Sequence, residues 1–206
     1  MKAVLGIDTS CYTTSAAVMN IDGQLLGEHR RLLTVPPGEK GLQQSQAVFQ
    51  HVQSVAGVFQ ALAPVLRETE LVAVAASTKP RPVEGSYMPV FTVSEALGRV
   101  LAHTLGVPFW GTTHQEGHLL AGLWSCRIGL PPSFLAVHLS GGTSELLHVT
   151  AKPQEGRLDI KILGATQDLH AGQLVDRVGV ALGLPFPAGP HLEKLAQKAQ
   201  GQDVFI

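Results

Sequence analysis

The sequence predicts an α/β fold in which one arrangement of strands and helices occurs twice. Short apolar runs of strand length alternate with segments whose apolar residues recur at the three- and four-residue steps of a helix. Two half-chains each open with a strand, a turn of small residues and a second strand, at residues 4–10 and 135–143. At 206 residues and 45% hydrophobic composition, the chain can bury one large core or two small ones.

The first half contains three strands, after which helices and strands alternate. Ile21-Asp22-Gly23 is a hairpin turn signal between the second and third strands. Ser94 is the expected N-cap of the second helix, and Gly106 suits its C-terminal cap. The predicted elements are strands over 3–7, 14–19 and 24–33, a helix over 44–66, a strand over 71–76, a loop over 78–90, a helix from 94 to 103 or 104, and a strand over 107–110.

The second half begins after a short helix that opens at His114 and reaches about residue 126. Its predicted elements are strands over 134–139, 143–149 and 158–163, a helix over 171–182, a loop over 185–190 and a final helix over 192–199. The predicted domains are therefore a first lobe at 1–112, a connecting helix and loop at 113–132, and a partial second lobe at 133–206.

The segment His114-Gln115-Glu116-Gly117-His118 is the strongest chemical signal in the chain. Two imidazoles four residues apart on a helix lie on one face, close enough to share a metal ion. Because the chain has nine histidines, this spacing alone is weak evidence for a metal site. Glu116 is two positions from each histidine, so helical geometry turns it away from them. The motif therefore differs from the metalloprotease H-E-x-x-H, in which the glutamate is the general base.

Two small-residue turns are candidate anion-binding loops. Ser140-Gly141-Gly142-Thr143 offers glycines that let backbone approach a ligand and hydroxyls that can donate to an anion. The alternative interpretation is an ordinary hairpin turn. Thr9 and Ser10 occupy the equivalent turn of the first half and form a second candidate phosphate turn. Asp176, on the helix predicted at 171–182, reads either as a ribose-binding carboxylate or as a solvated charge.

Composition limits the partners and the compartment. The net charge is −1, and no Lys/Arg run is present, so the chain lacks the basic patch of a protein that holds nucleic acid by itself. Any RNA partner would need another surface or subunit. Cys11 and Cys126 are too few for a disulfide framework, and the opening apolar run is too short for a signal peptide. We expect a soluble cytoplasmic protein with no membrane association.

The duplicated strand-strand-strand-helix-strand-helix unit resembles the actin-like superfamily, which includes the sugar kinases and heat-shock ATPases and is built from two ribonuclease H-like halves. In that superfamily, tight turns between the first two strands of each half offer backbone N–H groups to phosphates. The second copy in this chain is expected to be incomplete, because it lacks its last strands and helices.

Five segments in order resemble the tRNA N6-threonylcarbamoyladenosine synthase family, formerly described as O-sialoglycoprotein endopeptidases or glycoproteases. Residues 7–11 resemble the family's opening I-E/D-T-S-C, residues 114–118 its H-x-E-G-H, and residues 139–143 its V-S-G-G-x-T. Residues 168–176 and 182–190 resemble its D-D-A-A-G-E-A-F-D and L-G-L-x-Y-P-G-G-P. The spacing agrees throughout, and the resemblance covers nearly the whole chain.

The resemblance implies metal-dependent transfer of a threonylcarbamoyl group from threonylcarbamoyl-AMP to the N6 amine of the adenosine beside a tRNA anticodon. It implies one divalent metal, Fe or Zn, an adenine nucleotide or acyl-adenylate in the cleft, and tRNA bound through a complex with a related actin-like subunit and a small ATPase subunit. The implied site residues are His114 and His118 for the metal, Ser140, Gly141 and Gly142 for the phosphate or carbamoyl end, and Asp176 and Gly189 for the nucleoside.

Several positions depart from the family pattern. Tyr12 and Thr13 stand where the family has an acidic pair, and residues 79–85 replace its G-P-G loop. Leu169, Gln173 and Ala188 replace an Asp, a Glu and a Gly. Family members also continue about a hundred residues further, and that C-terminal third supplies an Asp as third metal ligand. The alternatives to an acyltransferase are a non-catalytic actin-like paralogue that supports a true synthase and, more remotely, a metalloprotease.

Overall fold

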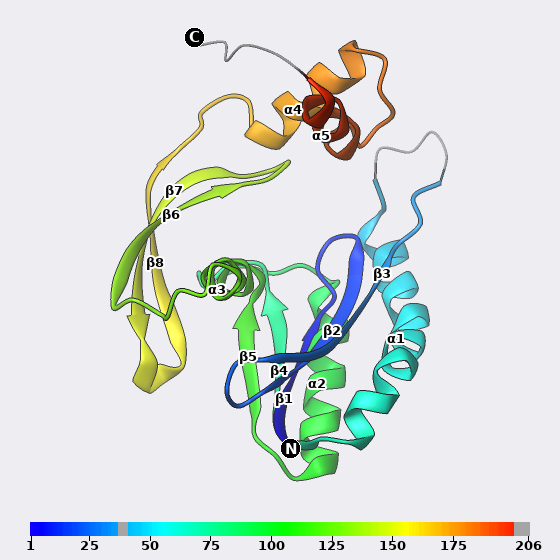
Figure 1. Cartoon of the computed structure of the whole chain (residues 1–206), viewed down its shortest axis with the longest axis vertical. Coiled ribbons are helices and arrows are strands. Elements are labelled where there is room, and N and C mark those ends of the chain that lie inside the picture. The colour runs from blue at the N-terminus through cyan, green and yellow to red at the C-terminus, as the bar shows by residue number, and fades with distance from the viewer. Residues whose placement is uncertain (37–40, 200–206) are drawn as a thin grey trace. The chain divides into compact units, whose positions relative to one another are not determined.

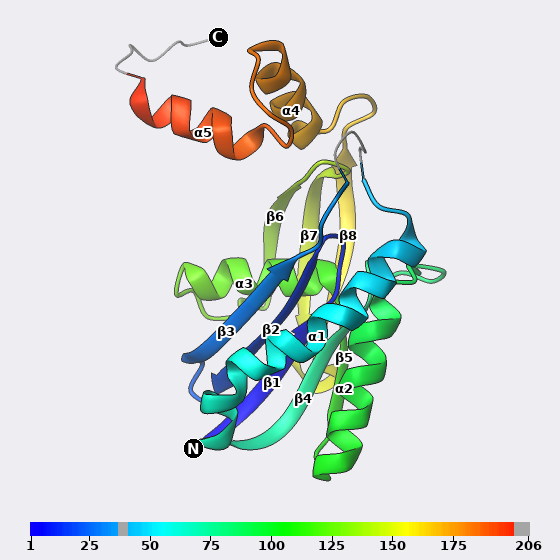
Figure 2. The same ribbon diagram turned by 90° about the vertical axis from the view of Figure 1, so that its right-hand side faces the viewer.

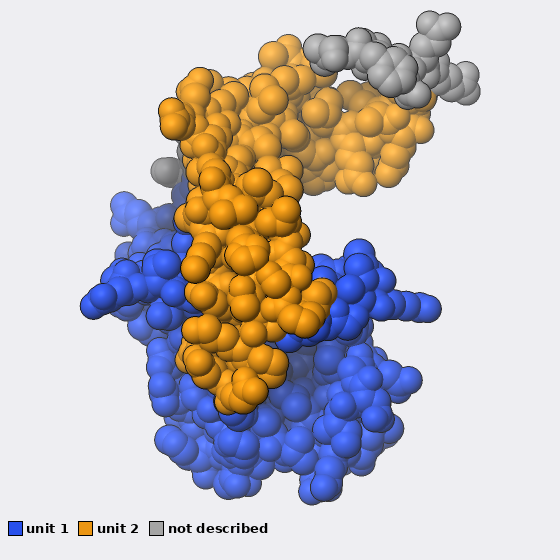
Figure 3. Space-filling model, turned by 90° about the vertical axis from the view of Figure 1, so that its left-hand side faces the viewer, with its two compact units in different colours: residues 1–130 blue, residues 131–206 orange. Residues whose placement is uncertain are grey.

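The computed structural model describes residues 1–36 and 41–199. The chain divides into two compact units, residues 1–130 and 131–206, which Figure 3 shows in different colours. The predicted connecting segment, 113–132, spans the border between these units, and the helix that it contains belongs to the first.

Unit 1 is built on a five-stranded sheet with the strand order β3-β2-β1-β4-β5 (Figure 1). Strands β1 (Lys2–Asp8), β2 (Thr13–Asn20) and β3 (Leu25–Leu32) form an antiparallel meander. Strand β4 (Glu70–Lys79) pairs in parallel with β1, and β5 (Phe109–Thr113) pairs in parallel with β4. The carboxyl ends of β1, β4 and β5 therefore meet at one edge of the sheet.

Helices α1 (Gln44–Arg67) and α2 (Phe91–Leu105) cover one face of this sheet (Figure 2). Side chains alternate across a strand, so every second residue of β1 faces these helices. Helix α3 (His114–Ser125) follows β5 without a linker. The buried core between the sheet and the helices consists of Ala3, Leu5, Ile7, Ala16, Val18, Val58, Leu62, Val74, Ala76 and Ala102.

The prediction that Ser94 caps α2 is wrong, because the helix begins three residues earlier. Phe91 is 2% exposed and Val90 is fully buried, so apolar packing fixes a start that has no polar N-cap. Ser94 lies fully buried inside the helix, where its hydroxyl donates to the carbonyl of Ser77 at 2.6 Å. The predicted C-terminal cap is confirmed: Gly106 has a φ of 67°, and its N–H donates to Ala102.

Unit 2 contains a three-stranded antiparallel sheet of β6 (Ser133–Leu139), β7 (Ser144–Lys152) and β8 (Arg157–Ala165). These strands repeat the meander of β1, β2 and β3. A 3₁₀ turn that the sequence did not predict, Pro153–Glu155, joins β7 to β8. The buried apolar residues of the sheet are Leu147, Val149 and Leu158.

The helices of unit 2, α4 (Ala171–Ala181) and α5 (Gly189–Lys198), pack against each other. Helix α5 begins three residues before the predicted start, inside the segment expected to be a loop. Pro190 occupies the first turn, where its missing N–H removes no helical hydrogen bond. None of the helices within residues 1–36 and 41–199 combines the length and the apolar character needed to cross a membrane.

Close packing of α2 on the sheet gives a stability prediction. A Cβ atom on Gly98 would lie 2.7 Å from the Phe109 ring and 3.1 Å from the Ala76 methyl, whereas one on Gly122 in α3 would meet nothing within 4 Å. Gly98→Ala should therefore lower the free energy of unfolding by about 1–3 kcal/mol. Gly122→Ala should raise it by about 0.5–1 kcal/mol. Urea denaturation measures both, and a Gly98→Ala protein as stable as the wild type would contradict this packing.

Candidate functional site

Polar side chains meet at the edge where the carboxyl ends of β1, β4 and β5 converge. Asp8 is the last residue of β1, Ser77 lies near the end of β4, and His114 directly follows β5. Asp8 Oδ2 lies 3.1 Å from His114 Nδ1, and the Ser77 hydroxyl donates to Asp8 Oδ1 at 2.5 Å. The carboxyl ends of parallel strands are the usual place for ligand sites in open α/β sheets.

Asp8 is held by several donors at once. Besides the Ser77 hydroxyl, the backbone N–H of Ser10 donates to Oδ1 at 3.0 Å, and its hydroxyl donates to Oδ2 at 2.7 Å. Burial on its own would raise the pKa of Asp8, but the hydrogen bond and charge of His114 and the Ser77 and Ser10 hydroxyls lower it below its ordinary value. Asp8 is therefore ionised at neutral pH, and His114 Nδ1 is the donor in their hydrogen bond.

The two histidines of α3 face each other as their spacing predicts. His114 Nε2 and His118 Nε2 are 2.9 Å apart, and the rings meet edge-on at 71° with their centroids 4.3 Å apart. A tetrahedral zinc ion with Zn–N bonds of about 2.0–2.1 Å would hold the two nitrogens roughly 3.3 Å apart. The rings need to separate by only about 0.4 Å to admit such an ion, so the pair fits two positions of a metal site.

In the described part of the chain, no further metal ligands are assembled around this pair. Among residues 1–36 and 41–199, no group of three or more His, Cys, Asp or Glu side chains is placed to hold a metal ion. The donor set is therefore two imidazoles, and the rest of a coordination sphere would come from water, substrate or other residues. Fe and Zn both accept imidazole nitrogen, so the chemistry of the pair suits either ion.

Glu116 has a structural role at the start of α3. It is 2% exposed. Its carboxylate accepts one hydrogen bond from the backbone N–H of Thr113 and another from the hydroxyl of Thr112. Thr113 in turn accepts from the Glu116 N–H, which completes a capping box. A glutamate used in this way is unavailable as a general base, which removes the geometric basis for a metalloprotease.

The first candidate phosphate turn uses its hydroxyls inside the protein. Thr9 is fully buried; its hydroxyl donates to the carbonyl of Val90 at 2.8 Å and accepts from the N–H of Ser94 at 3.1 Å. The Ser10 hydroxyl is bonded to Asp8. The turn therefore anchors α2 and orients Asp8, and its phosphate-binding role stays a prediction.

The second candidate loop lies against the amino end of α4. Gly172 N–H donates to the carbonyl of Ser140, and Ala171 N–H donates to the Ser144 hydroxyl. A Cβ on Gly172 would lie 2.6–2.7 Å from backbone atoms of Ser140 and Gly141, so only glycine allows this approach. Gly141 and Gly142 are exposed, and the positive end of the α4 dipole lies beside them. This geometry suits an anion, and the phosphate role of the loop remains a prediction.

Asp176 and Gly189, the predicted nucleoside contacts, lie at the junction of α4 and α5. Asp176 Oδ1 accepts from the N–H of Ala188 at 2.8 Å, so one carboxylate oxygen holds the turn that begins α5. Ala188 is fully buried against Gly179, where an added Cβ would come within 2.3 Å of the Ala188 methyl. Their contact with a nucleoside stays a prediction.

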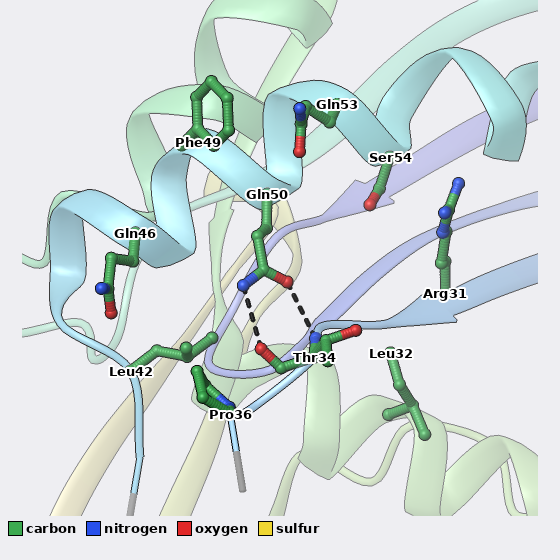
Figure 4. Close-up of a pocket in the computed structure, with 10 residues that line it drawn as sticks. All are labelled: Arg31, Leu32, Thr34, Pro36, Leu42, Gln46, Phe49, Gln50, Gln53 and Ser54. Atoms are coloured by element: carbon green, nitrogen blue, oxygen red, sulfur yellow. Dashed lines mark hydrogen bonds between the residues drawn. The ribbon is translucent and has the colours of Figure 1, made fainter. Parts of the chain in front are cut away.

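Two surface hollows lie away from all predicted site residues. One, of about 450 Å³, is shown in Figure 4; the Gln50 amide closes one side by bonding both the N–H and the carbonyl of Thr34. The other, of about 820 Å³, lies between the β2–β3 turn and the end of α3, where Trp124 Nε1 donates to the Gly23 carbonyl. Neither hollow contains a convergent set of catalytic groups.

Solved structures share the fold of this chain. A ROK family protein from Streptococcus pneumoniae TIGR4, solved in complex with sucrose, matches with a TM-score of 0.53 at 14% identity and covers 95% of this chain and 68% of its own. The Lmo2764 protein of Listeria monocytogenes matches with a TM-score of 0.52 at 14% identity, over 95% and 70%. These likenesses confirm the predicted actin-like fold.

Sequence comparison then identifies the family: the chain belongs to the tRNA N6-adenosine threonylcarbamoyltransferases, whose family model matches residues 40–206. Enzymes of that description from Moorella thermoacetica and Thermus thermophilus are 33% and 34% identical to it, over 95% and 96% of this chain. A relative from Streptococcus pneumoniae is 32% identical over 99%. The chain spans 55–58% of the length of these three relatives.

The contact between Gly172 and the 140–142 loop can be tested by substitution. Gly172→Ala should displace the loop, because the new methyl group would overlap backbone atoms that cannot rotate away. The backbone amide NMR signals of Gly141 and Gly142 should therefore shift strongly. Gly164→Ala is the matched control, since a Cβ there meets nothing within 4 Å. Unchanged loop signals in Gly172→Ala would show that the loop does not lie on α4.

The buried His51 beneath the first turn gives a pH prediction. It is fully buried, its Nδ1 bonds the Thr14 hydroxyl at 2.8 Å, and its Nε2 has no hydrogen-bond partner among the described residues. Burial lowers its pKa, although the Cys11 backbone and the charge of Asp8 partly oppose this. Below the ordinary histidine pKa of about 6.5, the unfolded chain therefore binds a proton that the folded chain does not.

Above that pH, the titration of His51 should consequently have no effect on the free energy of unfolding. As the pH drops from about 6.5 toward the lower pKa of His51 in the folded state, the free energy of unfolding should fall. The His51→Asn protein has no titrating group at this position. Its free energy of unfolding should therefore decline less than that of the wild type between about pH 7.5 and 5.5. Urea denaturation at several pH values measures it. An equal decline in both proteins would contradict a neutral buried His51.

Proposed function

We propose that this chain acts in the transfer of a threonylcarbamoyl group from threonylcarbamoyl-AMP to the N6 amine of the adenosine next to a tRNA anticodon. The observation that carries the proposal is the pair of facing imidazoles, His114 and His118, at the carboxyl edge of the sheet in a member of this family. The reaction class is acyl transfer. The N6 nitrogen bonds to the carbamoyl carbon and loses one proton, while the bond from that carbon to the phosphate oxygen breaks and AMP leaves.

His114 and His118 would hold a divalent ion, Fe or Zn, with their Nε2 atoms. When bound, that ion supplies Lewis-acid polarisation of the acyl group. In unit 2, the 140–142 loop and the amino end of α4 would bind the phosphate of the acyl-adenylate. The N–H of Ser140 donates to the Thr143 carbonyl and that of Gly142 to the Ser140 hydroxyl, so both would exchange these partners for the phosphate. Asp176 and Gly189 would contact its nucleoside.

RNA binding by this chain needs help from other proteins. A net charge of −1 gives little general attraction to the phosphate backbone, which usually supplies much of the affinity for nucleic acid. We therefore place the chain in a cytoplasmic complex in which a related actin-like subunit and a small ATPase subunit share the tRNA.

The second candidate function is a non-catalytic actin-like partner of a true synthase. Tyr12 and Thr13 in place of an acidic pair, and Gln173 in place of a glutamate, favour it. The facing histidines favour the enzyme, because a purely structural partner has no need of two converging imidazole nitrogens.

Binding and activity measurements on the same variants separate the two functions. The purified chain should bind one Zn²⁺ or Fe²⁺ and an adenine nucleotide, and His114→Ala with His118→Ala should abolish metal binding. His103→Ala, an exposed histidine on α2, is the matched control. Mass spectrometry of tRNA nucleosides should show N6-threonylcarbamoyladenosine formed by a reconstituted complex containing the chain, and its loss with the double variant.

If the complex modifies tRNA equally well with the wild-type chain and the double variant, the non-catalytic function holds. If the wild-type chain binds neither metal nor nucleotide, the enzymatic proposal fails.

A further inference from the structure

We propose that Asp8 is a positioning residue that fixes the tautomer of His114 and thereby aims the Nε2 lone pair of this ring toward His118. The inference rests on the proposed function for its purpose, a two-histidine metal site, but its geometry is independent of any metal. Asp8 reaches His114 from a strand 106 residues earlier in the sequence, through a 3.1 Å contact between Oδ2 and Nδ1.

The first step is that Asp8 cannot turn away from His114. Its Oδ1 accepts from the Ser77 hydroxyl and from the Ser10 N–H, and its Oδ2 accepts from the Ser10 hydroxyl as well as facing His114. These donors lie on two different segments of the chain. The carboxylate is thus fixed in position and in rotation, which is what an orienting group requires.

The second step is that the supports of Asp8 are themselves part of the core. Ser77 is 4% exposed, and its carbonyl accepts from the fully buried Ser94 hydroxyl at 2.6 Å. The N–H of Ser94 donates to the hydroxyl of Thr9, which is also fully buried. A continuous set of hydrogen bonds therefore connects α2 and the β1–β2 turn to the ring of His114.

The third step concerns the imidazole itself. A neutral imidazole carries one proton, on either Nδ1 or Nε2, and only the unprotonated nitrogen can ligate a metal. The Asp8 carboxylate accepts a hydrogen bond from Nδ1–H, so the ring proton is on Nδ1 and Nε2 carries the lone pair. That atom is the one that lies 2.9 Å from His118 Nε2.

Fold stability does not explain the contact. The side chains of His114 and Asp8 are 25% and 32% exposed, and partly exposed pairs of this kind add little to stability. Orientation of a histidine by a carboxylate is the usual arrangement around protein metal ligands, and its removal typically weakens metal binding 10–100-fold.

The sharpest test is Asp8→Asn, which keeps the shape of the side chain. The backbone N–H of Ser10 donates to Oδ1, and a backbone N–H can only donate. In the variant, the oxygen of the asparagine amide must therefore occupy the Oδ1 position. The amide NH₂ then faces His114 Nδ1 and donates to it. We therefore expect the tautomer to invert, with the proton on Nε2 in the variant and on Nδ1 in the wild type.

Two-bond ¹H–¹⁵N correlation spectra of the metal-free chain at about pH 8, where an ordinary histidine is neutral, report the tautomer directly. Loss of signals in His114→Gln assigns them. Asp8→Glu should retain the wild-type tautomer, because a carboxylate remains. Asp22→Asn, at an exposed turn, is the matched control. A wild-type His114 protonated at Nε2, or an unchanged tautomer in Asp8→Asn, would overturn the proposal.

Zinc affinity, measured by competition with a chromophoric chelator, is the second readout. Asp8→Asn should weaken Zn²⁺ binding about 10–100-fold, and Asp8→Glu should restore most of it. If Zn²⁺ binds the wild type and Asp8→Asn equally well, Asp8 does not position the ligand, although the metal proposal survives. If the wild type binds no Zn²⁺ but its tautomer inverts in Asp8→Asn, the metal proposal fails and the positioning role stands.

Discussion

The parallel pairing of β1 with β4 and of β4 with β5 is the constraint on which the candidate metal site depends. It brings three segments far apart in the sequence to one edge of the sheet, each ending in a polar residue. Asp8, Ser77 and His114 meet there because their strands end there. Without this register, the carboxylate and the imidazole would have no common location, and the histidine pair of α3 would be two surface side chains.

The site is also a balance between burial and hydrogen bonding. A carboxylate that is largely removed from water is costly unless it is hydrogen-bonded, and the partly exposed Asp8 meets this condition with two serines and a histidine. The buried Glu116 carboxylate is instead hydrogen-bonded to residues close to it in sequence, as the acid of a capping box. The two acidic residues of this site thus have different tasks: Asp8 faces the imidazole, and Glu116 starts the helix that carries it.

Much of the fold was predictable from the sequence. The helix period over α1 and the small-residue turns of both halves identified the duplicated architecture, and the positive φ of Gly106 was foreseeable from its place after α2. The starts of α2 and α5 were not predictable, because burial of Phe91 and the tolerance of Pro190 in a first turn decide them. The His114–His118 pair followed from its spacing alone.

Asp8 as the partner of His114 was missed, because the contact joins residues 106 positions apart and depends on strand order. The sequence nonetheless contained an indication of this contact. Asp8 ends a buried strand, and the carboxyl ends of neighbouring parallel strands lie at the same edge of a sheet. The fit of Gly172 against the 140–142 loop also could not be predicted, because it depends on where a helix end meets a turn. Of the two candidate phosphate turns, only the second contains glycines, and these are exposed. The first has Thr9 and Ser10, whose hydroxyls bond inside the protein.

X-ray absorption spectroscopy of the zinc-loaded chain tests the central claim most directly, that His114 and His118 share one metal ion. The account predicts a zinc shell containing two imidazole nitrogens at about 2.0–2.1 Å, which disappears when both histidines are replaced by alanine. A zinc shell without imidazole scattering, or one that is unchanged in that double variant, would contradict it.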